Sequence, residues 1–136
     1  MRPDRPNPPP GRSANGLPAW LRYVGVGGLA TAAHYVLLAA LVEGAGWPAP
    51  WAAGAGAALG AQLAFVGNRR YTFGHPGPWW PAWWRFQITA LLGGITSVGV
   101  VALGVWLGAH YLLAQAVATA LVLVLTYGIN RRWAFG

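Results

Sequence analysis

The sequence of 136 residues has no cysteine, no lysine and only two acidic residues, Asp4 and Glu43. Without cysteine, thiol catalysis, disulfides and thiolate metal sites are excluded. The three histidines, His34, His75 and His110, are scattered, so a metal centre has too few ligands and a hydrolase has no pair of carboxylates. The sequence therefore predicts neither an enzyme nor a cofactor.

Charged residues are scarce, and most of them are positive. Charged residues make up 8% of the chain and apolar residues 56%, and the mean hydropathy is +0.43. A soluble domain of this length carries far more charge. Nine arginines give a net charge of +7, which suits anionic lipid headgroups or phosphates. We do not expect nucleic-acid binding, because the arginines lie beside apolar runs rather than on a polar face.

Four apolar stretches are present, at residues 21–42, 51–67, 86–107 and 111–129. Each approaches the ~20 residues that a helix needs to cross a bilayer, although the second is short and rich in glycine. Residues 1–18 are rich in proline and arginine, which predicts a disordered basic tail. The sequence thus predicts an all-α membrane protein with four transmembrane helices in one domain over residues 19–136.

The arginines predict how these helices are oriented. They lie before the first stretch or, in the case of Arg22, at its start, flank the connection between the second and third, and follow the fourth, whereas the other two turns have none. With four spans, every arginine falls on one side of the membrane. By the positive-inside rule, this predicts a multi-pass protein of the cytoplasmic (inner) membrane with both termini in the cytoplasm.

A six-residue motif occurs twice. Asn68-Arg69-Arg70-Tyr71-Thr72-Phe73 closes the first pair of apolar stretches, and Asn130-Arg131-Arg132-Trp133-Ala134-Phe135 closes the second. An arginine and an aromatic residue open each pair, as Arg22-Tyr23 and as Arg85-Phe86. The pattern predicts two tandem parallel helical-hairpin repeats, at about residues 20–73 and 84–135, related by an axis along the membrane normal.

In these features the chain resembles the GtrA-like family of small polytopic membrane proteins of surface polysaccharide synthesis. The resemblance covers everything after the proline-rich tail and is carried by the basic start at Arg22, the glycine-rich first stretch with Thr31, the two hairpins and the two motif copies. It implies a flippase that moves polyprenyl-phosphate-linked sugars across the cytoplasmic membrane for surface polysaccharide or cell-wall glycosylation. It also implies a polyprenyl-phosphate glycosyltransferase as a partner.

The candidate site residues follow from what such a task requires. Arginine offers a fork of donors to phosphate oxygens, and asparagine adds an amide donor. The predicted contacts to the lipid phosphate are Asn68, Arg69, Arg70, Asn130, Arg131 and Arg132. Polar residues within the spans predict a groove for the sugar, formed by Thr31, His34, Gln62 and Gln115. The alternatives are that the arginines only anchor the protein to anionic lipids and that these polar groups only join neighbouring helices.

Three functions stay open on the sequence alone. The first is the flippase, the second a non-transporting membrane anchor that recruits a glycosyltransferase, and the third a small drug/proton exporter. The exporter is the least favoured, because proton exchange needs a carboxylate within a span and Glu43 lies in a turn. Four short helices enclose little volume, so we also expect a homo-oligomer.

Overall fold

The computed structural model describes residues 16–136, so the predicted tail falls almost entirely outside the described residues. The described chain is helical and contains no strand. Its elements are α1 (Ala19–Ala39), η1 (Ala40–Gly44), α2 (Ala49–Gly67), η2 (Asn68–Thr72), α3 (Trp79–Trp106), α4 (Tyr111–Ile129) and η3 (Asn130–Ala134), where η marks a π-helical turn. The prediction of an all-α chain is confirmed over these residues.

Three helical stretches are long and apolar enough to cross a membrane. They are Ala19–Gly44, Trp79–Trp106 and Leu113–Ala134. This confirms a multi-pass membrane protein. Helix α2 is not among the three, and its crossing stays a prediction.

Helix α3 begins earlier than the apolar stretch from residue 86 indicates. Pro78 is its N-cap residue, and Trp79 to Trp84 form its first turns. Pro81 is tolerated there because the first residues of a helix have no intrahelical partner for their N–H groups. The tryptophan-rich segment is therefore part of a continuous helix rather than a separate connection.

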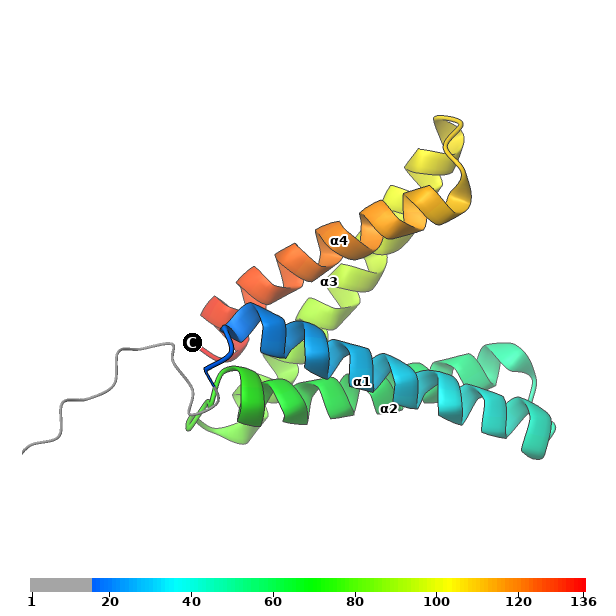
Figure 1. The fold of residues 1–136 in the computed structure, drawn as a ribbon. Coiled ribbons are helices and arrows are strands. Elements are labelled where there is room, and N and C mark those ends of the chain that lie inside the picture. Colours follow the sequence, from blue (N-terminus) through cyan, green and yellow to red (C-terminus); the bar gives the residue numbers. More distant parts are fainter. Residues whose placement is uncertain (1–15) are drawn as a thin grey trace, which may run out of the picture.

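The four helices form two hairpins that spread apart like a V (Figure 1). Helix α1 packs mainly against α2, and α3 mainly against α4, while contacts between the pairs are few. The hairpins meet at the end where α1 and α3 begin and where η2 and η3 lie. They diverge toward the turns at residues 45–48 and 107–110. We call the meeting point the junction end.

Glycines of α2 allow α1 to approach closely. A Cβ atom on Gly56 would lie 2.8 Å from the backbone oxygen of His34, and one on Gly60 would lie 3.1 Å from the backbone oxygen of Ala30. Both contacts are tighter than ordinary side-chain packing. Gly56 and Gly60 therefore allow close packing within the first hairpin.

Aromatic rings fill the junction end, and their contacts in one half have counterparts in the other. The rings belong to Tyr23, Phe65, Phe73, Phe86, Tyr127 and Phe135. Tyr23 contacts Tyr127 with centroids 5.5 Å apart, and Phe86 contacts Phe65 at 5.6 Å. Phe73 likewise contacts Tyr127 at 5.9 Å, and Phe135 contacts Phe65 at 5.8 Å. In the first two contacts, the second helix of one hairpin supplies a ring to the first helix of the other, and in the last two it supplies a ring to the residue that ends the motif of the other.

Candidate functional site

Both copies of the repeated motif adopt the same π-helical turn. The amide nitrogen of Phe73 donates to the carbonyl oxygen of Asn68 at 2.9 Å, and that of Phe135 donates to Asn130 at 2.9 Å. These bonds span five residues rather than four, which widens the helix by one residue. The recurrence of the motif indicated that its two copies share a conformation. It did not indicate a π turn, because each turn ends its helix and no further helical residues follow to show a shift in the apolar pattern.

The arginine that opens each hairpin binds the motif that closes it. Nη1 of Arg22 donates to the carbonyl oxygen of Tyr71, and Nη1 of Arg85 donates to that of Trp133 at 3.0 Å. Tyr71 and Trp133 occupy the same place in their motif copies. Arg22 and Arg85 thus lie beside the motif arginines, although the sequence marked them only as the start of each hairpin. We call these six arginines the cationic cluster: Arg22, Arg69, Arg70, Arg85, Arg131 and Arg132.

Two guanidinium groups in this cluster have unused donors. Nη2 of Arg69 donates to the carbonyl oxygen of Gly77, and its guanidinium carbon lies 5.2 Å from the ring centre of Trp79. Nη1 of Arg69 and Nε of Arg22 are buried and have no hydrogen-bond partner among residues 16–136. A buried donor without a partner is costly, so both positions favour an incoming acceptor such as a phosphate oxygen.

The other predicted phosphate contacts divide into two groups. Arg70, Arg131 and Arg132 are exposed. Asn68 is buried, and its Oδ1 accepts a hydrogen bond from the Thr72 hydroxyl at 2.7 Å. The three arginines are therefore accessible to a ligand, whereas the Asn68 oxygen is already hydrogen-bonded within its own π turn.

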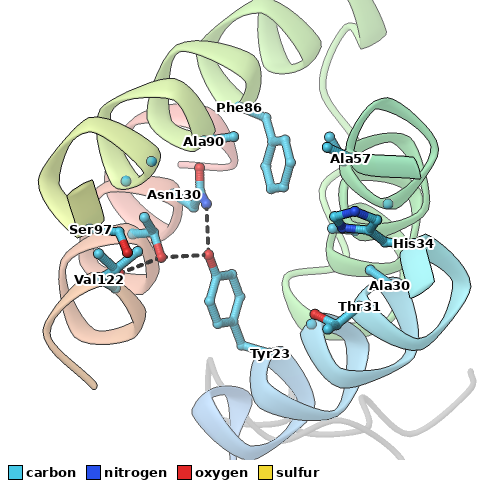
Figure 2. A pocket seen from close by; sticks show the side chains of 17 residues that line it. Tyr23, Ala30, Thr31, His34, Ala57, Phe86, Ala90, Ser97, Val122 and Asn130 are labelled. Atoms are coloured by element: carbon cyan, nitrogen blue, oxygen red, sulfur yellow. Dashed lines mark hydrogen bonds between the residues drawn. The ribbon is translucent and has the colours of Figure 1, made fainter. Parts of the chain in front are cut away.

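A pocket of about 410 Å³ lies between the two hairpins (Figure 2). Its wall is built largely from small residues, and these leave space between the two hairpins. The polar residues that line it are Tyr23, Thr31, His34, Ser97, Thr126 and Asn130. All four helices and the first residue of η3 contribute to it, so neither hairpin alone forms the pocket.

Half of the predicted polar groove lines this pocket. Thr31 and His34 do, and the His34 ring stacks on Tyr35 with centroids 5.3 Å apart. Gln62 and Gln115 lie outside the pocket lining. Oε1 of Gln62 accepts a hydrogen bond from Nε1 of Trp83 at 2.6 Å, which links α2 to α3. Gln115 is exposed on α4.

The junction end of the pocket contains a buried polar network that the sequence did not predict. Nδ2 of Asn130 donates to the Tyr23 hydroxyl at 3.0 Å, and that hydroxyl donates to Oγ1 of Thr126 at 3.0 Å. One signal was available. Tyr23 lies one helical turn before Gly27, on the same face of α1 as Thr31 and His34. Its partners, Thr126 on α4 and Asn130 at the start of η3, are more than a hundred residues away in sequence, and no local pattern indicates them.

The described residues offer no metal site, since no three histidine or acidic side chains gather among them. What the junction end presents is a cationic cluster beside a mostly apolar pocket that has several polar side chains in its lining. This combination fits a ligand that carries both an anionic and a polar uncharged part.

Comparison with known proteins identifies the chain by family. No curated protein matches it. The family model for the GtrA/DPMS transmembrane domain matches residues 22–135, which is nearly the whole described range. The matched region includes both motif copies, the aromatic junction and the pocket. The chain therefore belongs to the GtrA/DPMS transmembrane family, which links it to membrane glycosylation and polysaccharide synthesis.

Proposed function

We propose that this protein moves polyprenyl-phosphate-linked sugars across the cytoplasmic membrane, for surface polysaccharide or cell-wall glycosylation. One observation carries the proposal. Asn130 lines the pocket between the hairpins, and Arg131 and Arg132 follow it directly in the chain. The cationic cluster and the pocket are therefore joined at one residue, as a phosphate and the sugar attached to it would require.

The cationic cluster recognises the phosphate. Guanidinium groups stay charged at every physiological pH and bind phosphate through paired donors. The exposed Arg70, Arg131 and Arg132 meet the lipid at the membrane surface. The unused donors of Arg22 and Arg69 then hold the phosphate more deeply.

The pocket shelters the sugar. Its volume of about 410 Å³ falls within the range of roughly 300–1,000 Å³ typical of small-molecule sites. Small residues leave room for a headgroup, and the hydroxyl and imidazole groups of Thr31, His34 and Ser97 offer hydrogen bonds along the wall. The prenyl chain stays in the surrounding lipid.

The proposal includes four spans and cytoplasmic termini. Helix α2 packs along α1, so it enters the bilayer wherever α1 does. Four spans put the junction end and all its arginines on the cytoplasmic side, in agreement with the positive-inside rule. The matching aromatic contacts of the two hairpins support tandem parallel repeats.

The alternative is a membrane anchor that recruits a polyprenyl-phosphate glycosyltransferase. The exposed arginines favour it as much as they favour a flippase, because either protein needs a cationic cytoplasmic face. The pocket favours the flippase, since an anchor needs no cavity between its hairpins with hydrogen-bonding side chains in the lining. An exporter is less favoured, because Glu43 is exposed in η1, at the end of the hairpin opposite the junction.

The test is a transbilayer assay in proteoliposomes with polyprenyl-phosphate sugars. Wild-type protein is compared with Arg70→Ala and Arg132→Ala, which remove exposed charges without opening a cavity. Both variants should reduce transport at least tenfold. Glu43→Gln is the matched control, because it changes a charge at the opposite end and should transport like the wild type.

Other results would select the alternatives. Wild-type protein that moves no lipid-linked sugar but still binds a glycosyltransferase identifies an anchor. Proton-coupled transport of a drug that depends on Glu43, without transport of lipid-linked sugar, identifies an exporter.

A further inference from the structure

The network at the junction end fixes the direction of each of its hydrogen bonds. The Thr126 hydroxyl donates to the carbonyl oxygen of Val122 at 2.7 Å, so its oxygen is free to accept from Tyr23. The Tyr23 hydroxyl thereby uses its only proton and can act toward Asn130 only as an acceptor. The Asn130 amide must turn its nitrogen to Tyr23 (Figure 2).

The other atom of this amide is consequently left without a partner. Oδ1 of Asn130 is buried and accepts no hydrogen bond from any described residue, and Asn130 as a whole is only 1% exposed. In Figure 2 its oxygen points away from Tyr23. A buried carbonyl oxygen without a donor is unfavourable, so its retention indicates a donor that residues 16–136 do not supply.

The matching place in the other half of the molecule lacks this network. By motif register, Phe86 corresponds to Tyr23, Ala64 to Thr126 and Asn68 to Asn130. Phe86 and Ala64 have no hydroxyl, and the Asn68 oxygen already accepts from Thr72. The free acceptor is therefore present in one half only and is not required by the shared architecture.

We infer that Oδ1 of Asn130 is a subsite for a hydroxyl group of a lipid headgroup, and specifically for a hydroxyl of the transported sugar. A carbonyl oxygen repels the oxygens of a phosphate and attracts an O–H donor, so this subsite reads the uncharged part of the ligand. Tyr23 and Thr126 are positioning residues that hold the amide in the orientation required. The inference rests on the proposed function for the source of the hydroxyl.

The test compares two ligands that differ only in the sugar. Binding of polyprenyl-phosphate glucose and of polyprenyl phosphate is measured in phosphatidylcholine nanodiscs, whose lipid brings no hydroxyl of its own. The wild type should bind the sugar-bearing lipid more tightly. Asn130→Leu should reduce binding of the sugar-bearing lipid about tenfold and change binding of polyprenyl phosphate less than twofold.

Conservative variants keep the test valid if Asn130→Leu does not fold. Tyr23→Phe and Thr126→Val remove single hydroxyls and release the amide, so each should reduce the preference for the sugar-bearing lipid about threefold to tenfold. Tyr127→Phe and Thr96→Val are their controls. Tyr127 contacts Tyr23 and Thr96 bonds to its own helix as Thr126 does, but both lie outside the pocket lining, so both should keep the wild-type preference.

Three results would overturn the inference. Equal losses for both ligands in Asn130→Leu and Tyr23→Phe would make the network structural or a phosphate site. An unchanged preference in all variants would exclude it from binding. Displacement of the sugar-bearing lipid by added phosphatidylglycerol, in the wild type but not in Tyr23→Phe, would reassign the hydroxyl to an ordinary phospholipid. A wild-type protein that binds neither polyprenyl ligand would instead contradict the proposed function.

Discussion

The ring of Phe73 stacks on the ring of Phe135, with centroids 5.1 Å apart and an angle of 18° between their planes. Each residue ends one copy of the repeated motif, and each hairpin contributes one of the two rings. The hairpins otherwise make few contacts, so this pair is one of those that hold the junction end together.

We expect the two rings to be energetically coupled. Phe73→Leu and Phe135→Leu should each lower the free energy of unfolding, and the double variant should lower it by about 1 kcal/mol less than the sum, because one stacking contact is lost only once. The measurement is reversible unfolding in mixed micelles. Phe73→Leu combined with Trp106→Leu is the control, since Trp106 is 79% exposed, and this pair should be additive. Additivity of the Phe73 and Phe135 pair would contradict the prediction.

A methyl group on Gly56 should destabilise the first hairpin. Gly56→Ala places a Cβ atom 2.8 Å from the His34 backbone oxygen, which α1 can relieve only by moving away. We expect a loss of about 1–3 kcal/mol, seen as a lower midpoint of thermal unfolding in detergent. Gly54→Ala on the same helix meets no atom within 4 Å and should not lower the midpoint. Equal midpoints for the two variants would show that α1 and α2 are not in contact at Gly56.

The bond between Gln62 and Trp83 should stabilise the contact between the hairpins. Trp83→Phe removes the indole N–H that donates to Gln62 and leaves the partly buried amide oxygen without this donor, at a cost of about 1 kcal/mol. Trp84→Phe is the matched control, because Trp84 is 55% exposed and should tolerate the change. In a Gln62→Leu background, Trp83→Phe should cost much less. If its cost is the same in both backgrounds, the bond does not contribute.

Cysteine labelling can test whether α2 crosses the membrane. The chain has no cysteine, so single substitutions give an unambiguous signal. With four spans, Pro76→Cys and Gly136→Cys should react with an impermeant maleimide from the cytoplasmic side only. Ala45→Cys and Leu107→Cys should react only from the opposite side. Labelling of residues 45 and 76 from the same side would show that α2 does not cross.

Local features of the sequence were sufficient for part of the site. The periodicity of a helix places Thr31 and His34 on one face of α1, and both line the pocket. The same reasoning could not separate them from Gln62 and Gln115, which lie outside the pocket lining. A polar residue within a span must face some partner, but its own helix does not determine whether that partner is a pocket or an indole N–H on another helix.

The sequence by itself determined the helical membrane character of this chain, because long apolar stretches with almost no charge can satisfy their backbone in lipid only as helices. It also determined the placement of arginines at the hairpin ends and their repetition. Only the tertiary structure decided that Tyr23 meets Asn130, that the motif copies form π turns, and that the buried amide oxygen of Asn130, a residue of the pocket lining, is left unpaired. These features depend on how two hairpins pack at the junction end, and contacts between residues so distant in the chain leave no local pattern to read.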